Sequence, residues 1–153
     1  MDMDKEFIIR RASRSDEDCI RKLFLEMMRT IYETDDVKGY EDGYLDRYWN
    51  GGDDSIFVAD NGEVIAFLSA EVHKDPVYYL YIDDFSVRRG YRRRGIGTAL
   101  MKAAESHARD LGIPAILLHV EKKNEKALAL YERLGYSGFR DDGNRILMKK
   151  DLK

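Results

Sequence analysis

A change of hydrophobic pattern divides the chain into two kinds of structure. Residues 55–60 and 63–74 are rich in Val, Ile, Phe and Ala and are joined by Asn61-Gly62, a pair typical of a tight hairpin turn. Beyond them, apolar residues recur every three or four positions over 96–111, which predicts a helix, and a β-rich run follows at 116–121. We therefore expect a mixed α/β fold around a mostly antiparallel sheet, with one strand–helix–strand crossover.

The other elements follow from the same patterns. A capping-box pattern at 15–18 marks the start of an amphipathic helix that runs to Ile31, and the acidic segment 33–54 fits a loop with a short helix. The remaining predicted elements are strands at 6–12, 78–87, 136–141 and 145–150 and a helix at 124–134. The prediction is a sheet of six to seven strands flanked by about four helices.

Length and composition limit the organisation of the chain. At 153 residues with 44% hydrophobic side chains, the sequence is expected to form one domain over 1–153 with a single core. One cysteine, Cys19, allows neither an internal disulfide nor a cysteine-based zinc cluster, and it fits the reducing cytoplasm. We find no signal-peptide pattern and no long apolar run, so no membrane association is predicted.

Charge is distributed unevenly along the sequence. Residues 1–86 hold 21 acidic and 10 basic side chains, whereas residues 87–153 hold 8 acidic and 16 basic ones. The net charge of −3 therefore combines −11 in the first part with +8 in the second. Because local potential concentrates ligands of opposite sign, this asymmetry favours one anionic and one cationic partner.

The segment 87–100 carries the clearest chemical signal. It holds five arginines within seven residues, followed by Gly95 and Gly97, between a predicted strand and a predicted helix. Glycines let a ligand approach the backbone closely, and the N–H groups of a first helical turn favour an anion. Arg92 and Arg94 add charge-assisted hydrogen bonds to phosphate oxygens. This arrangement predicts a pyrophosphate site.

Other interpretations of the same segment fit less well. A Rossmann fingerprint needs a third glycine where Leu100 stands, and a Walker A loop needs Gly-Lys-Ser/Thr, which is missing. An arginine run is also typical of a nucleic-acid patch, but the chain as a whole is acidic. We therefore expect no nucleic-acid partner.

Two motifs in the same order resemble those of the GNAT family of N-acetyltransferases. Its acetyl-coenzyme A motif, Arg/Gln-x-x-Gly-x-Gly/Ala, is matched by Arg92, Gly95 and Gly97. Its second pattern, Asn-x-x-Ala-x-x-x-Tyr-x-x-x-Gly-Phe/Tyr, is matched by Asn124, Ala127, Tyr131, Gly135 and Tyr136. The resemblance extends from the first predicted strand to the last, but it says little about residues 15–54, which vary most in this family.

The resemblance implies how acetyl-coenzyme A would be held. In similar proteins the strand at 79–87 parts from the strand at 116–121, and the cofactor lies between these splayed central strands. Backbone groups near the end of the first strand would bind the pantetheine arm and thioester carbonyl, at Phe85, Ser86 and Val87. The pyrophosphate loop would comprise Arg92, Arg93, Arg94, Gly95, Ile96, Gly97 and Thr98. Asn124 would contact the pantetheine arm or a bridging water, although an asparagine at a helix start also fits a simple N-cap.

Acetyl transfer from a thioester needs an acid near the leaving thiolate and a route for the amine proton. Tyr131, in the second motif, is the candidate acid. Asp83 and Asp84 are neighbours on one strand, so they face opposite sides of the sheet. We favour Asp83 as the base, because it resembles a strand carboxylate that some family members use, and we expect Asp84 to cap local structure. The alternatives are His119 or Glu121 on the facing strand, or no dedicated base. No metal is implied.

The predicted function is acetyl-coenzyme A-dependent transfer to a primary amine, directly within a ternary complex. A non-catalytic acyl-coenzyme A sensor of the same fold is the alternative. Segment 33–54 carries eight acidic and two basic residues among several aromatic ones, which favours a cationic small molecule or a peptide or protein amine as acceptor. The sequence allows a homodimer but does not set the oligomeric state, name the acceptor or distinguish acetyl from longer acyl donors.

Overall fold

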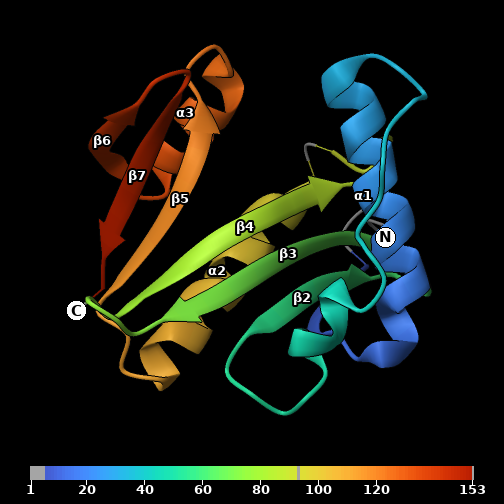
Figure 1. Cartoon of the computed structure of the whole chain (residues 1–153), viewed down its shortest axis with the longest axis horizontal. Coiled ribbons are helices and arrows are strands. Elements are labelled where there is room, and N and C mark those ends of the chain that lie inside the picture. The colour runs from blue at the N-terminus through green and yellow to red at the C-terminus, as the bar shows by residue number, and fades with distance from the viewer. Residues whose placement is uncertain (1–5, 93, 153) are drawn as a thin grey trace. The chain divides into compact units, whose positions relative to one another are not determined.

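The computed structural model describes residues 6–92 and 94–152 (Figure 1). Within them, seven strands form one sheet in the order β1-β2-β3-β4-β5-β7-β6. The strands are β1 (Ile8–Arg11), β2 (Ser55–Asp60), β3 (Val64–His73), β4 (Tyr79–Val87), β5 (Ala115–Glu121), β6 (Ser137–Asp142) and β7 (Arg145–Asp151). The helices are α1 (Glu17–Tyr32), α2 (Ile96–Asp110) and α3 (Glu125–Arg133), with short 3₁₀ helices η2 (Arg14–Asp16) and η3 (Tyr44–Tyr48).

These elements confirm the predicted mixed α/β fold and its strand order along the chain. The described residues contain three α-helices instead of about four, because the segment 33–54 forms only the 3₁₀ helix η3. β4 and β5 are parallel, as the predicted crossover through α2 requires.

Contacts group the chain into two compact units. Unit 1 comprises Met1–Ser69 and Asp84–Ala103, and unit 2 comprises Ala70–Asp83 and Ala104–Lys153. The unit boundaries fall within β3, β4 and α2, so each of these elements contributes residues to both units. The single domain over 1–153 stays a prediction.

Unit 1 is built on the pairing of β1 with β2 and on the apolar side of α1. β1 and β2 are antiparallel, with Ile8 opposite Asp60 and Arg11 opposite Phe57. The helical repeat predicted from sequence places the fully buried Ile20 and Leu23 in one core cluster with residues from η3, β2 and β3. This cluster fixes α1 and η3 as parts of one packed body.

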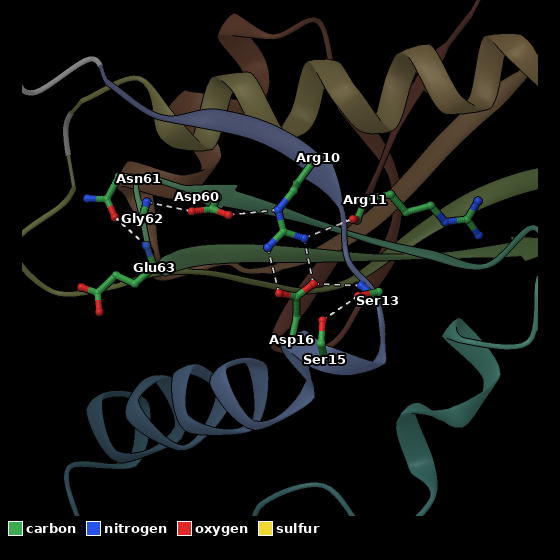
Figure 2. A network of polar contacts seen from close by, with 9 residues as sticks. All are labelled: Arg10, Arg11, Ser13, Ser15, Asp16, Asp60, Asn61, Gly62 and Glu63. Carbon is green, nitrogen blue, oxygen red and sulfur yellow. Dashed lines mark hydrogen bonds and ion pairs between the residues drawn. The ribbon is translucent and has the colours of Figure 1, made fainter.

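A network of polar contacts joins β1 to α1 and to the turn between β2 and β3 (Figure 2). The guanidinium of Arg10 donates two hydrogen bonds of 2.8 Å to the carboxylate of Asp16 and one of 3.0 Å to Asp60. Asp60 also accepts a hydrogen bond from the backbone N–H of Gly62, within the predicted hairpin turn. Arg10 thus joins β1 to the start of α1, six residues further on, and to the end of β2, which is distant in sequence.

The start of α1 differs from its sequence prediction. The carboxylate of Asp16 accepts the backbone N–H of Ser13 at 2.9 Å, so the capping interaction starts at Ser13 and not at Ser15. Ser15 instead shares a hydrogen bond of 2.9 Å with the Ser13 hydroxyl. The short helix η2 precedes α1 and moves the cap two residues towards the N-terminus.

Asp16→Asn is expected to lower the free energy of unfolding by about 2 kcal/mol, because the charge-assisted bonds of Asp16 to Arg10 are lost while Arg10 stays partly buried. Urea unfolding measures this change, and Asp18→Asn, at an exposed position of the same helical turn, serves as the control.

The Arg10 guanidinium lowers the pKa of Asp16 below its ordinary value of 3.8. The stabilisation is therefore present above that value and shrinks as pH falls through the lowered pKa. A constant difference between parent and variant down to pH 2 would contradict this interpretation.

Unit 2 is a sheet of paired strands with α3 following β5. β5 and β7 are antiparallel over their full length, from Ala115 opposite Asp151 to Glu121 opposite Arg145, and β7 pairs in turn with β6 (Figure 1). A register shift between Gly138 and Arg140 interrupts the second pairing. These pairs fix the side chains of β5, β6 and β7 relative to one another.

No helix within residues 6–92 and 94–152 has the length and apolar character that a membrane span requires.

Candidate functional site

The N-terminus of α2, in unit 1, has the features of an anion site. Gly95 adopts φ +79°, a conformation that favours glycine, and its carbonyl accepts the N–H of Ala99 at 3.0 Å to start the helix. The first turn of α2 contains no acidic residue. Its leading N–H groups precede any intrahelical partner, and the helix dipole adds positive potential there.

Gly97 has a packing role that the sequence did not reveal. A Cβ placed on Gly97 would lie 3.1 Å from Cζ of Phe85, which is closer than nine in ten real contacts of this kind. The ring of Phe85 on β4 therefore packs against the backbone of the first turn of α2. Gly97 lets the helix start close to the strand, and a larger residue would displace the helix start or the ring.

The arginines before α2 make different contacts within unit 1. Arg88 pairs with Glu63 at 2.9 Å, and the backbone N–H of Arg89 donates to Glu26 at 2.8 Å. Arg92 is exposed, and its Nε lies 3.4 Å from the carbonyl of Val87. The guanidinium of Arg94 lies 5.1 Å from the ring centroid of Tyr91. The predicted site residue Arg93 lies outside the described residues.

Tyr40, in the acidic segment, contacts the middle of β4. Its hydroxyl donates a hydrogen bond of 2.6 Å to the carboxylate of Asp84, and the backbone N–H of Asp84 donates to the hydroxyl of Ser69. The Tyr40 ring stacks on Phe24 at 3.9 Å between centroids and on Tyr44 at 5.0 Å. Asp84 is thus held between β3 and an aromatic stack.

Side chains of α1 hold the segment that carries Tyr40. Arg21 donates to the carbonyl of Tyr40 at 2.8 Å and to the carboxylate of Glu17 at 2.9 Å. Glu17 also accepts the indole N–H of Trp49 at 3.0 Å. The hydrogen bond from Trp49, followed by that from Arg21, lowers the pKa of Glu17. Two aromatic residues of 33–54, Tyr40 and Trp49, are therefore fixed on α1.

The strand positions predicted for the site differ in burial. Asp83 is exposed, Phe85 and Val87 are half-buried, and Ser86 is buried. Within unit 2, β4 pairs with β5 over Leu80–Ile82, opposite Ile116–Leu118. Both strands continue beyond these pairs, β4 to Val87 and β5 to Glu121.

The second motif lies on α3. Asn124 accepts the N–H of Ala127 at 3.2 Å through its side-chain oxygen, so it caps the helix, as the simpler interpretation of this residue predicted. The ring of Tyr131 contacts that of Tyr136 edge to face, with 6.1 Å between centroids. Burial raises the pKa of the Tyr131 phenol to about 12. The phenol therefore keeps its proton at neutral pH.

A chain of hydrogen bonds crosses the strands of unit 2. The hydroxyl of Tyr81 lies 2.6 Å from Nδ1 of His119, and Nε2 of His119 lies 2.7 Å from a carboxylate oxygen of Asp142. Arg140 donates to both oxygens of Asp142, at 2.8 and 3.1 Å. The bonds from Arg140 and then His119 hold the pKa of Asp142 at about 2. We call Tyr81, His119 and Asp142 the relay.

Sequence patterns indicated His119 but not its two partners. By its pattern alone, Tyr81 is one of many packing tyrosines of the strands, and Asp142 belongs to a predicted turn. The parallel register would have revealed Tyr81, because Tyr81 lies opposite Leu117 and His119 follows two residues later on the same face of β5. Asp142 has no such signal, because its place depends on the register shift in β6.

Within residues 6–92 and 94–152, no group of three or more His, Cys, Asp or Glu side chains has an arrangement that could hold a metal ion.

Comparison with known proteins places these features in context. The sequence profile of the acetyltransferase (GNAT) family matches residues 23–136. A mycothiol acetyltransferase of Thermomonospora curvata is 35% identical over 88 residues, which is 57% of this chain and 29% of that protein. The chain therefore spans less than a third of the length of this relative.

Solved structures share the fold over nearly the whole chain. The PaiA N-acetyltransferase of Thermoplasma acidophilum, in complex with coenzyme A, has a TM-score of 0.76 at 18% identity and covers 95% of this chain and 99% of its own. An aminoglycoside acetyltransferase from an uncultured soil metagenomic sample, in complex with trehalose, has a TM-score of 0.75 at 19% identity. The match covers 93% of this chain and 95% of that protein's chain. At these identities the likeness concerns the fold.

Proposed function

Because the chain belongs to the acetyltransferase (GNAT) family, we propose that it is an N-acetyltransferase that moves an acetyl group from acetyl-coenzyme A to a primary amine. Direct transfer in a ternary complex is the simplest route, since no covalent intermediate on the enzyme is needed. The observation that carries the proposal is the start of α2, where the first turn holds no acidic residue and where Arg92, Gly95 and Gly97 match the family motif.

The residues at the start of α2 fit a pyrophosphate. Open N–H groups, a glycine turn and the exposed Arg92 provide donors without a competing carboxylate in the first turn. We propose that Arg92, Arg94 and the backbone of 95–98 bind the pyrophosphate, together with Arg93. The backbone of Phe85, Ser86 and Val87, and the side chain of Asn124, are proposed to bind the pantetheine arm. Acetyl-coenzyme A supplies the activated acyl group.

Gly95→Asp is expected to weaken acetyl-coenzyme A binding by roughly 10- to 100-fold, because it places a negative charge beside the proposed pyrophosphate site. Gly90→Asp is the matched control, since Gly90 also has positive φ and a Cβ added at either glycine would have no neighbouring atom within 4 Å. Calorimetric titration measures both. Equal affinities in the two variants would contradict the site. Gly97 is less suitable for this test because a side chain there would also press against Phe85, so a change in packing could not be separated from a change in affinity.

We propose that the acceptor carries a cationic amine. The acidic segment 33–54 is fixed on α1, and the stack of Tyr40 and Tyr44 lies beside the carboxylate of Asp84. Coulomb attraction and cation–π contact with an ammonium each contribute on the order of 1 kcal/mol near a surface. Small-molecule, peptide and protein amines all meet this requirement.

The relay supports a route for the ammonium proton. The hydrogen-bond pattern assigns Nε2–H of His119 as donor to Asp142 and Nδ1 as acceptor from the Tyr81 hydroxyl. As the ammonium proton moves to the Tyr81 oxygen, the phenolic proton passes to Nδ1, and the resulting imidazolium lies beside the ionised Asp142. The neutral amine then attacks the thioester carbonyl. Asp83, exposed on β4, is the alternative acceptor of this proton.

Tyr131 is proposed as the group that stabilises the leaving thiolate. Its phenol is protonated at neutral pH, as an ordinary phenol is, and burial raises its pKa further, to about 12. The hydroxyl is therefore available as a donor to the developing charge on sulfur.

The free Cys19 thiol fits a reducing compartment, and on this ground we propose that the protein works in the cytoplasm.

A screen for thiol release tests the proposed function. Acetyl-coenzyme A is incubated with amines of one, two and three positive charges, free coenzyme A is detected with a thiol reagent, and the acetylated amine is identified by mass spectrometry. Reactions without amine correct for hydrolysis and for the thiol of Cys19. Amine-dependent release with matching product is expected, rising with charge at low salt. Cofactor binding without release for any amine would identify an acyl-coenzyme A sensor instead.

A further inference from the structure

Unit 2 contains an apolar pocket of about 370 Å³ on the face of its sheet. Half-buried Tyr79 and Leu117 and buried Leu147 contribute to its lining, and two large hydrophobic residues of the lining, Val77 and Phe139, are exposed, with 62% and 56% of their surfaces accessible. The pocket therefore has an apolar interior and an apolar rim. Such a lining favours an uncharged hydrophobic group, because burial removes its surface from water.

Ring contacts hold the sides of the pocket. The imidazole of His73 stacks on Tyr79 with 4.8 Å between centroids and an interplanar angle of 5°. The ammonium of Lys149 lies 4.9 Å from the centroid of Phe139. A pocket whose aromatic walls are already packed loses little freedom when a ligand enters it.

The basic side chains of the lining are paired with carboxylates. Arg140 donates to Asp142, and Lys149 lies 3.4 Å from the carboxylate of Asp151. Both basic side chains of the lining therefore have acidic partners. Because the positive charges are balanced by acidic partners, the pocket has little positive potential to attract an anionic ligand. An apolar ligand is compatible with this lining.

Tyr81 and His119 belong both to the pocket lining and to the relay. A molecule that fills the pocket thus lies against the groups proposed to take the ammonium proton. The polar edge of the pocket suits an amine, and the apolar remainder suits the group attached to that amine. Because the relay residues form one edge of the pocket, the amine of a substrate would contact that edge and the group attached to it would contact the apolar part of the lining.

Resting on the proposed function, we propose that this pocket binds the body of the acceptor, and that the acceptor is a primary amine bearing an aromatic or branched aliphatic group. The amine lies at Tyr81 and the apolar group lies between Leu117, Val77 and Phe139. An arylalkylamine and the N-terminal residue of a peptide share this chemistry.

Three amines with the same two-carbon attachment test the proposal: ethylamine, 3-methylbutylamine and 2-phenylethylamine. The kcat/KM of the parent enzyme is expected to rise along the series, with a ratio of roughly 10- to 100-fold between 2-phenylethylamine and ethylamine, as burial of a side chain of this size gives. A ratio near one would overturn the proposal while leaving the acetyltransferase activity established. Phenylalanine amide and a short peptide amide beginning with Phe distinguish a small amine from a peptide as the source.

Val77→Asp changes the rim of the pocket at an exposed position, where a folding defect is not expected. This variant is expected to reduce the ratio of kcat/KM between 2-phenylethylamine and ethylamine at least tenfold. Ile8→Asp is the matched control, because Ile8 is 61% exposed on β1 of unit 1 and should leave the ratio unchanged. A high ratio that survives Val77→Asp would place the apolar preference elsewhere and overturn the proposal.

Calorimetric titration with 2-phenylethylamine provides a readout that does not need turnover. Binding to the parent and its loss in Val77→Asp are expected. Binding without acetylation of any amine would contradict the proposed function but support the pocket. Sedimentation velocity tests the competing occupant: if the parent is a dimer and Val77→Asp a monomer, this face is covered by a second copy of the chain and the proposal is wrong.

Discussion

Exchange of His119 for glutamine lowers kcat by ~10²-fold or more if the relay carries the ammonium proton. Glutamine keeps a polar side chain at this position of β5 but does not accept and release a proton near neutral pH. Tyr81→Phe interrupts the same route one group earlier, by removing the hydroxyl that lies 2.6 Å from Nδ1. Both variants are measured at saturating acetyl-coenzyme A and amine, where kcat reports steps after binding.

Asp142 contributes to this route through its charge. Arg140 and His119 hold its pKa at about 2, so it stays ionised throughout the range in which an amine acetyltransferase is assayed. Asp142→Asn therefore removes a constant negative charge beside the imidazolium, without introducing a titration of its own. We expect kcat to fall, since the imidazolium that forms during proton transfer loses the neighbouring negative charge that stabilises it.

Two variants separate the relay from the alternatives. Asp83→Asn tests the carboxylate favoured from the sequence, and His107→Gln tests a histidine of α2 outside the relay. The relay predicts a large loss for His119→Gln and small changes for the other two. A large loss for Asp83→Asn with near-normal turnover of His119→Gln would instead identify Asp83 as the base.

The sheet and its helices could be predicted because local signals agreed with tertiary structure. The Asn61-Gly62 turn, the glycine that ends α2 and the change from strand to helical repeat each specify backbone geometry over a few residues. The start of α1 was misplaced because Ser13 and Ser15 precede acidic residues at the same spacing, and only the contact of Asp16 with Arg10 on β1 decides between them.

The candidate site was predictable where one segment contains its chemistry. The loop before α2 holds its arginines and glycines within a short stretch, so sequence alone could predict an anion site there. The relay depends on contacts among β4, β5 and β6, and the Tyr40–Asp84 bond joins a variable loop to a strand. Such pairs depend on the register of the strands and on the path of the loop, and neither can be inferred from composition or periodicity.

Tyr131 and Tyr136 provide a matched pair for the leaving-group side of the reaction. Their rings contact each other edge to face, and burial raises the pKa of both phenols. Only Tyr131 is proposed to act on the thiolate. Within the described part of the chain, the hydroxyl of Tyr136 is buried without a hydrogen-bond partner.

Tyr131→Phe is expected to lower kcat by ~10²-fold with little change in acetyl-coenzyme A affinity. A phenol with a pKa of about 12 is a weaker acid than an ordinary thiol, so its contribution is a hydrogen bond to the developing thiolate and not complete proton transfer. Loss of activity through ionisation of Tyr131 is therefore not expected below about pH 11. Tyr136→Phe removes an unpaired buried hydroxyl, so it should leave kcat unchanged and preserve or raise the free energy of unfolding. Equal kcat in both variants, with chemistry rate-limiting, would show that Tyr131 serves packing alone.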